Sequence, residues 1–175
     1  MSQMTDGPIV DGASMRHVLG HFATGVVAIT GIHPDSGEPV GLAANSFTSV
    51  SLDPPLVAFC VGLTSTSWPL VRAAGRFTIN ILADSQEAVC RRLASPGADK
   101  FRDVDWTPAP SGAPVLTGAL AWIDAELDAE HAAGDHTIVV ARAHHLRASD
   151  QEPLLFYRGG YGRIARPEDP AGGVV

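Results

Sequence analysis

The amino-acid sequence predicts a mainly β domain, an antiparallel barrel or sandwich with two or three short helices. Strand-like runs follow one another along the 175 residues, and most turns between them are short enough for hairpins. Helical patterns are few and brief. Hydrophobic residues make up 45% of the chain, which suits one domain with a substantial core.

The first expected element is a helix that Ser14 caps and Thr24-Gly25 ends. A buried strand at residues 26–30 follows, and a turn at residues 32–39 leads to the next strand. The helix is predicted by apolar residues at helical spacing: Met15, Val18, Leu19 and Phe22.

The next strand-like run, residues 41–55 (GLAANSFTSVSLDPP), has an unusual composition. A core strand normally carries bulky apolar side chains, but this run carries small, hydroxyl and amide side chains. We expect a break at Asn45-Ser46 and an end at residues 53–55, where two prolines stop strand pairing. The small side chains leave room for a flat ligand, and the polar ones offer it hydrogen bonds.

A continuous apolar strand is expected at residues 56–62. Either Ser65 or Ser67 is expected to cap a short helix that runs to Ala74. Residues 76–82 (RFTINIL) then predict another strand.

The following segment predicts a helix and a long loop. Asp84, with Glu87 three residues later, resembles a capping box and predicts a helix to about Leu93. Residues 95–114 are rich in Pro, Gly and Asp, and a loop of this length usually has a function or is flexible.

Two long strands, residues 119–130 and 136–147, are expected to pair around the turn Gly134-Asp135. Apolar residues alternate in the first strand with four carboxylates, so the carboxylate face is expected to meet solvent or an interface. These carboxylates are Asp124, Glu126, Asp128 and Glu130. Two shorter strands, at residues 153–157 and 161–164, complete a set of about seven or eight.

The two ends carry no periodic pattern. Residues 1–12 and 166–175 are therefore expected to be flexible tails around a domain at residues 13–165. No signal peptide is visible, so the cytoplasm is the expected compartment. No apolar run approaches the roughly 20 residues that cross a bilayer, and no membrane association is expected.

Charge and cysteine content narrow the function further. Twelve Lys and Arg against 19 Asp and Glu give a net charge of −7, which disfavours nucleic acid as a partner. Cys60 and Cys90 have no metal-binding or disulfide-framework spacing and are expected to be reduced.

No metal site is expected, although the chain has seven histidines. His144 and His145 are adjacent on a strand and point to opposite faces. His17 and His21 share a helix face, but no Glu or Cys completes a ligand set. The usual dinucleotide, P-loop and nucleophile-elbow motifs are also absent.

Seven segments, taken in order and spacing, carry a resemblance to a known family. They are HFATGVVAIT (21–30), GLAANSFTSVSLDPPLVAFCV (41–61), TSTS (64–67), RFTINILADSQ (76–86), DKF (99–101), GDHTIV (134–139) and PLLFYRGGYGRI (153–164). The chain resembles, over about residues 15–164, the flavin reductases, FMN-binding split barrels that serve two-component monooxygenases. This resemblance implies an antiparallel, Greek-key-like split β-barrel.

The resemblance also implies a flavin site. The isoalloxazine ring is expected against Ala44, Asn45 and Ser46, beside the Cys60-Val61 strand. The hydroxyls of residues 64–67, with Ser65 and Ser67 at a helix start, are expected to cradle a phosphate, or simply to cap the helix. The remaining expected flavin contacts are Thr24 near the ribityl tail and Lys100 and Phe101, with Lys100 either a counter-charge for the phosphate or a solvated loop residue.

On the nicotinamide side, His136 is implied as the catalytic residue that orients the carboxamide or steadies charge during hydride transfer. Tyr161 is expected to border the nicotinamide, or else to cover the core. Asp135 either orients the His136 ring or only serves the turn.

The function expected from the sequence is that of a homodimeric NAD(P)H:flavin oxidoreductase. It would pass a hydride from NADH or NADPH to FMN or FAD and supply reduced flavin to a partner monooxygenase. Two alternatives remain open: a flavin-binding barrel with another redox role, like pyridoxamine-phosphate oxidases, and a non-enzymatic carrier of a small ligand. The hydroxyl-rich run disfavours an apolar carrier, because an apolar cavity would leave those hydroxyls unpaired.

Overall fold

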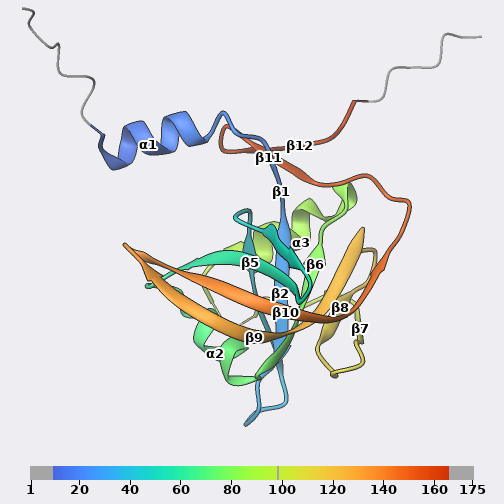
Figure 1. Ribbon diagram of the computed structural model, residues 1–175. Coiled ribbons are helices and arrows are strands. Elements are labelled where there is room, and N and C mark those ends of the chain that lie inside the picture. Colours follow the sequence, from blue (N-terminus) through green and yellow to red (C-terminus); the bar gives the residue numbers. More distant parts are fainter. Residues whose placement is uncertain (1–9, 98, 166–175) are drawn as a thin grey trace, which may run out of the picture.

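The computed structural model describes residues 10–97 and 99–165. Its main body is a seven-stranded antiparallel sheet with the strand order β3-β2-β6-β9-β10-β5-β4 (Figure 1). The edge strand β3 also contacts β5, near the other end of this order, so the sheet curls upon itself. Its strands are β2 (Val27–Ile32), β3 (Pro39–Ala44), β4 (Thr48–Leu52), β5 (Pro55–Gly62), β6 (Arg76–Ile81), β9 (Ala121–Ala133) and β10 (His136–Ala148). The predicted mainly β, antiparallel fold is confirmed.

Five short strands form two smaller sheets in the described residues. One joins the N-terminal segment to the C-terminal hairpin: β1 (Thr24–Gly25), β11 (Leu155–Tyr157) and β12 (Gly160–Gly162). The other is a hairpin of β7 (Trp106–Pro108) and β8 (Pro114–Leu116). Strand β7 lies inside the segment predicted as a long loop, residues 95–114, and β8 begins at its last residue. The longer strands lie where they were expected, and the chain breaks between β3 and β4 as predicted.

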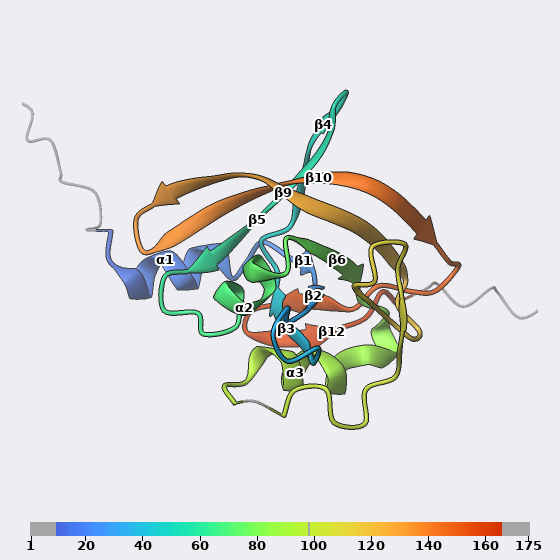
Figure 2. The same cartoon turned by 90° about the horizontal axis from the view of Figure 1, so that it is seen from below.

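Three α-helices accompany the sheets in the described residues: α1 (Gly12–Leu19), α2 (Trp68–Ala73) and α3 (Glu87–Ala94). Figure 2 shows α3 on the side of β2 and β3 that lies away from the long β9–β10 hairpin. Helix α2 also contacts β2 and β3, but its Trp68 and Arg72 side chains donate to the Glu130 carboxylate of β9. Helix α1 instead extends from the body beside the β11–β12 hairpin, and none of its residues is buried (Figure 1). No described helix has the length and apolar character needed to span a membrane.

Two apolar clusters hold the fold together. The first fills the curled sheet beneath α2, where the rings of Phe59, Trp68 and Phe77 meet edge to face with centroids 5.5–6.1 Å apart. The second lies beneath α3 and includes Leu82, Leu93 and Cys90. The second cluster fixes the end of α3 against β3, which positions one wall of the cleft described below.

Two of the three predicted helix caps, those of α1 and α3, were wrong in detail. The N-cap of α1 is Asp11, whose carboxylate accepts from the Ser14 N–H at 2.7 Å, and the Asp11 N–H donates to Ser14 Oγ at 3.0 Å. Ser14 is thus the N3 residue of a capping box that begins at Asp11. At α3, a turn of 3₁₀ helix (Asp84–Gln86) comes first, and Gln86 Oε1 accepts from the Ala83 N–H at 3.0 Å.

The expectation for the carboxylate face of β9 was also wrong at one position. Asp124 is fully buried, because the loop before β8 folds over it. Its carboxylate accepts from the Ser111 N–H at 2.9 Å and from the Ser111 hydroxyl at 2.5 Å. A buried carboxylate is tolerated when such hydrogen bonds replace water.

The predicted tails fall mostly outside the described residues, namely residues 1–9 and 166–175. Within the described part, helical structure begins at Gly12, one residue before the predicted start of the domain.

Candidate flavin and nicotinamide site

A cleft of about 480 Å³ opens between the end of β3, the end of β5 and the C-terminus of α3. Nine of the residues predicted from the sequence line it: Ala44, Asn45, Ser46, Cys60, Val61, Ser65, Ser67, Lys100 and His136. These residues come from segments up to 92 positions apart, between Ala44 and His136. The structure therefore brings most of the predicted site together.

The break after β3 shapes one wall of the cleft. Ser46 Oγ accepts from the Cys60 N–H at 2.8 Å and donates to the Cys60 carbonyl at 3.2 Å, which fastens the break to β5. The hydroxyl of Ser46 is thus occupied by the protein. The amide side chain of Asn45 has no hydrogen bond to any described residue and remains free for a ligand in the cleft.

In the hydroxyl-rich segment before α2, Ser65 and Ser67 make different contacts. Ser65 Oγ accepts from the Trp68 N–H at 3.1 Å and so supports the start of the helix. Ser67 is the N-cap residue of α2, but its side chain makes no capping hydrogen bond. Instead, Ser67 Oγ accepts from the ammonium group of Lys100 at 2.8 Å.

Lys100 is a buried cation at the base of the cleft, with only 8% of its surface exposed. Its ammonium group donates to Ser67 Oγ and to the Leu93 carbonyl, both uncharged. No carboxylate of the described residues forms an ion pair with it. Loss of water around the ammonium group lowers the pKa of Lys100, and an anion in the cleft would oppose that effect.

His136 also lines the cleft, at the start of β10. Its Nδ1 is 2.7 Å from Asp135 Oδ1, and this hydrogen bond is the main cause that lowers the pKa of Asp135. An ionised carboxylate can only accept a hydrogen bond, so Nδ1 carries a proton. The opposite nitrogen, Nε2, lies on the Gly62 side, 3.8 Å from the point where a Cβ of Gly62 would stand.

A second cavity of about 160 Å³ adjoins the cleft, sharing Ala43, Ala44, Asn45 and Ala94 with it. Tyr161 lines this cavity and not the main cleft, and the Cys90 thiol donates to its hydroxyl at 3.3 Å. Burial raises the pKa of Tyr161 to about 12 and also raises that of Cys90. Both groups are therefore neutral near pH 7, and the cavity suits an uncharged group.

Two predicted residues lie outside both cavities. Thr24 pairs with Phe156 between β1 and β11, and its buried hydroxyl has no partner among the described residues. Phe101 packs into the apolar cluster beneath α3, with its ring 3.3 Å from the point where a Cβ of Gly41 would stand. Phe101 thus supports the wall of the cleft from behind.

Sequence reasoning missed the contribution of α3. Leu93, Ala94, Ser95 and Pro96 line the main cleft, and Cys90 lines the second cavity. In the sequence, these positions have the pattern of an ordinary amphipathic helix and its end. Only the packing of α3 on β3 brings them to the site. Thr64 and Thr66, within the quoted hydroxyl segment, also line the cleft.

The chain is similar to known proteins over most of its length. Residues 19–165 match the family model of the flavin reductase like domain. A flavin reductase of Pseudomonas putida is 47% identical over 157 residues, covering 89% of this chain and 92% of the relative. The reductase subunit HsaB of a flavin-dependent monooxygenase of Rhodococcus jostii is 46% identical over 170 residues, covering 94% of this chain and 86% of the relative.

A solved structure supports the same assignment. The NADH:FAD oxidoreductase SgcE6 of Streptomyces globisporus, in complex with NAD and FAD fragments, superposes with a TM-score of 0.83. It is 36% identical, and the match covers 93% of this chain and all of that one, 100%. With a family match over most of its length and relatives close to half identical, the chain belongs to the flavin reductase family.

Proposed function

We propose that this chain is an NAD(P)H-dependent flavin reductase that supplies reduced flavin to a monooxygenase component. The observation that carries the proposal is the make-up of the cleft. A free amide, a row of hydroxyls, a buried, uncompensated cation and a histidine whose Nδ1 is held by Asp135 line it together. The family and the names of the relatives support the same activity.

The described residues fit a flavin. Ala43 and Ala44 leave space for a flat ring, and the unpartnered Asn45 amide can donate to and accept from its polar edge. Lys100 and Ser67 offer charge and hydrogen bonding to a phosphate of FMN or FAD. An apolar ligand would leave these polar groups unpaired, which disfavours the carrier alternative.

In this proposal the protein contributes position and electrostatics. A flavin held by the residues of the cleft would supply the acceptor for a hydride from NADH or NADPH. His136 orients the nicotinamide with Nε2, while Asp135 holds the ring and its proton at Nδ1. Tyr161 and Cys90 border the adjoining cavity with neutral side chains and exclude water there.

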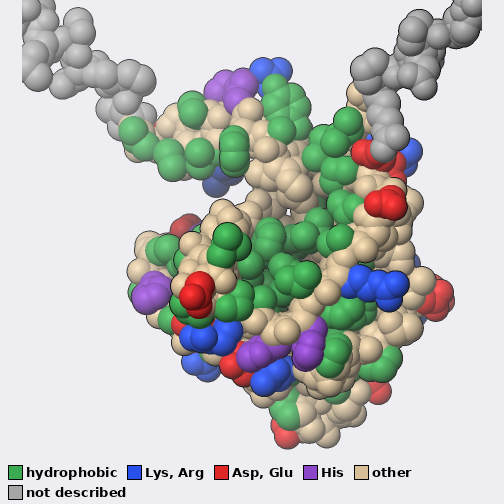
Figure 3. Space-filling view, turned by 45° about the vertical axis from the view of Figure 1, so that its right-hand side comes forward, with side chains coloured by type: hydrophobic (Ala, Val, Ile, Leu, Met, Phe, Trp, Pro, Cys, Tyr) green, Lys and Arg blue, Asp and Glu red, His purple; other side chains and the backbone are tan. Residues whose placement is uncertain are grey.

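The proposal includes a homodimer. Helix α1 has no buried residue, and its Val18 and Leu19 are 65% and 59% exposed, as is Phe22 just beyond, at 75%. Hydrophobic side chains also gather over the hollow beneath α1 (Figure 3). An apolar helix held away from its own body needs a partner surface, and a second copy of the chain would supply it.

Two free cysteines and a reducing co-substrate support a cytoplasmic location.

The test is the steady-state oxidation of NADH and of NADPH in the presence of FMN, FAD or riboflavin. We expect oxidation of at least one nicotinamide to depend on added flavin and to saturate with it. Oxidation that is absent, or that is independent of flavin, would contradict the proposal.

A further inference from the structure

The end of α1 and the tip of the β11–β12 hairpin border a groove outside the flavin site. It has a volume of about 470 Å³ and is lined by Arg16, His17, Gly20, His21, Arg158 and Gly159. The Arg158 N–H joins its two walls by donating to the Gly20 carbonyl at 2.9 Å. Among the residues that the structure describes, no carboxylate lines this groove, although the whole chain has a net charge of −7. The groove is therefore a local basic surface on an acidic protein.

Basic side chains at the end of a helix often serve only to satisfy its last carbonyls. In α1 these carbonyls already have other partners. Those of residues 16–20 each accept a hydrogen bond at 2.8–3.0 Å, four from backbone N–H groups and one, that of His17, from His21 Nδ1. Capping the helix therefore uses neither the guanidinium group of Arg158 nor Nε2 of His21.

The side chains of the groove thus have hydrogen-bonding capacity that no described residue uses. His21 Nδ1 donates to the His17 carbonyl, so Nε2 is the nitrogen left for a partner, and it becomes a donor when the ring is protonated. The Arg158 guanidinium lies over the Tyr157 ring, 5.2 Å from its centroid, and forms no ion pair with a described carboxylate. The His17 ring stands edge-on to that of His21, with centroids 5.1 Å apart. These four residues, His17, His21, Tyr157 and Arg158, are called the basic patch below.

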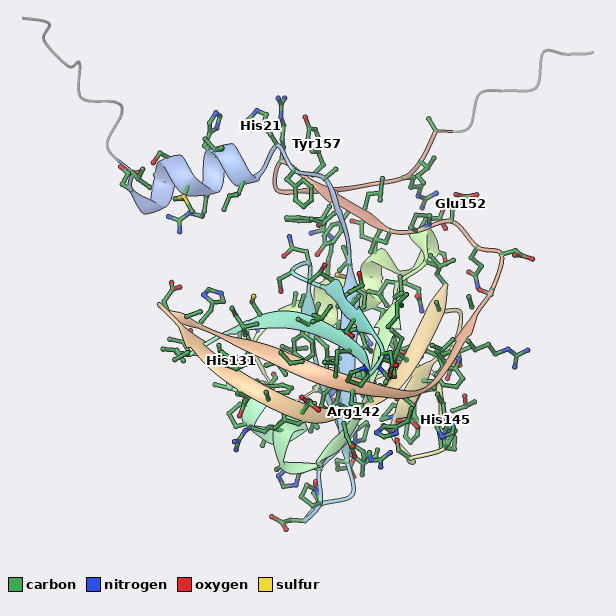
Figure 4. The ribbon with its side chains drawn as sticks, viewed as in Figure 1. His21, His131, Arg142, His145, Glu152 and Tyr157 are labelled. Carbon is green, nitrogen blue, oxygen red and sulfur yellow. The ribbon has the colours of Figure 1, made fainter. Side chains whose placement is uncertain are left out.

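The basic patch faces away from the apolar side of α1. Helical periodicity puts His17 and His21 on the side of the helix opposite to Met15 and Leu19. Figure 3 shows histidine and basic side chains over this end of α1, away from the hollow where the hydrophobic side chains gather. Figure 4 places His21 beside Tyr157 at the hairpin. The basic patch therefore stays open when a second copy covers the apolar side.

The form of the basic patch suits a protein better than a small anion. All four residues are exposed and lie on elements that project from the body, whereas sites for small ligands enclose most of the ligand. Tyrosine and arginine are enriched in protein interfaces, and a positive surface pairs with an acidic one. The same hairpin carries Phe156 and Tyr161, which line the second cavity. A protein docked on the hairpin tip would touch the element that borders the flavin site.

We propose that the basic patch is the docking surface for the monooxygenase component, which binds it through an acidic segment. This inference rests on the proposed function and goes beyond it, because it assigns a surface of this chain to the delivery of reduced flavin. Docking at the hairpin tip would release the reduced flavin close to the protein that consumes it.

The first experiment uses a fluorescein-labelled oligoglutamate peptide as the probe and measures its binding to the full chain by fluorescence anisotropy. Wild-type protein should bind the peptide at low salt and lose affinity as salt is added. His21→Asn combined with Arg158→Asn should weaken binding about 10-fold. Asparagine suits position 158, where φ is 48°. His131→Asn combined with Arg102→Asn is the matched control, because it removes the same two side-chain types at other exposed positions.

The second experiment adds the purified monooxygenase component. The patch variant should form less oxygenated product per NADH oxidised than wild type, while its own flavin-dependent oxidation of NADH and its mass in light scattering stay unchanged. Unchanged product per NADH would overturn the assignment to the monooxygenase component, and a changed mass would assign the basic patch to a contact between copies of this chain.

Three further results decide the inference. No peptide binding by wild type, or equal weakening in the control variant, would overturn it. Displacement of the peptide by inorganic pyrophosphate of similar affinity would show a small-anion site and would also overturn it. A wild-type protein without flavin-dependent oxidation of NADH would refute the proposed function, whereas peptide binding reports on the basic patch separately.

Discussion

The polar groups that the cleft offers to a ligand are those side chains that make no hydrogen bond to the protein itself. Ser46 is tied to both backbone groups of Cys60, while its neighbour Asn45 has no protein partner in the described chain. The sequence places both residues at the break in the strand, but it does not distinguish the occupied hydroxyl from the free amide. That distinction depends on how β5 approaches the break, which no local pattern encodes.

Asn45→Leu should weaken FMN binding by about 1–3 kcal/mol, because the polar edge of the ring would lose its partner. Titration of flavin fluorescence measures this change. Thr48→Ala, on the exposed strand β4, serves as the control and should leave the affinity unchanged. An Asn45→Leu protein with wild-type affinity would remove Asn45 from the site.

His136→Ala should raise the KM for NADH or slow flavin reduction, with little change in FMN affinity. The reason is that His136 lines the cleft and Asp135 holds its Nδ1 at 2.7 Å, which leaves Nε2 available to the nicotinamide. Steady-state kinetics and a parallel FMN titration separate the two effects. Asp135→Asn, which keeps the turn but removes the charge, should show a smaller change in the same direction. An equal loss of FMN binding in His136→Ala would show that His136 lies on the flavin and not on the nicotinamide.

At the level of elements, the periodic patterns predicted the strands correctly where the alternation of side chains along one strand decides which of them are buried. The strands β2, β5 and β6 and the long β9–β10 hairpin lie within a few residues of their expected bounds. The failures are contacts between distant segments. Asp124 alternates as a surface residue should, yet its carboxylate is buried against Ser111. Strand β7 lies inside the predicted loop at residues 95–114, and β8 begins at the last residue of that loop.

A buried amide explains why β8 forms. Asn80 of β6 donates to Thr30 Oγ1 at 3.0 Å and, at the long distance of 3.4 Å, to the Pro114 carbonyl, and its Oδ1 accepts from the Leu116 N–H at 2.8 Å. Thr30 also donates to the Pro114 carbonyl at 2.6 Å. These bonds attach both ends of β8 to the sheet.

Asn80→Ala should therefore lower the free energy of unfolding by about 1–3 kcal/mol, since the buried Leu116 N–H would lose its acceptor. Urea denaturation measures the change. Thr107→Ala, at an exposed position on β7, should change stability by no more than about 0.5 kcal/mol. Equal stability of Asn80→Ala and wild type would mean that the amide does not anchor β8.

At the scale of the whole molecule, the site is an assembly of strand ends, one helix end and one hairpin turn. The sequence predicted the parts with local signatures, and it missed α3 because the approach of α3 to β3 is a tertiary contact. It likewise could not reveal that α1 stands apart from the body. His21 and Tyr157 lie together where α1 meets the β11–β12 hairpin, whereas His131, Arg142 and His145 lie along the distant β9–β10 hairpin (Figure 4).

The exposed apolar face of α1 makes the proposed dimer testable. Wild-type protein should elute with the mass of two chains in size-exclusion chromatography with light scattering. Val18→Asp combined with Phe22→Asp should shift it toward a single chain, because both side chains are more than half exposed in one copy, at 65% and 75%, and would be buried in two. His33→Ala, in an exposed turn far from α1, is the control. A monomeric wild-type protein would remove the dimer from the proposal.

The most direct test of the central claim is anaerobic mixing of the protein with FMN and a nicotinamide. We expect the visible absorbance of the flavin to bleach when NADH or NADPH is added, at a rate that depends on the protein and is lowered in His136→Ala. No bleaching with either nicotinamide, or bleaching at the same rate without the protein, would contradict the account.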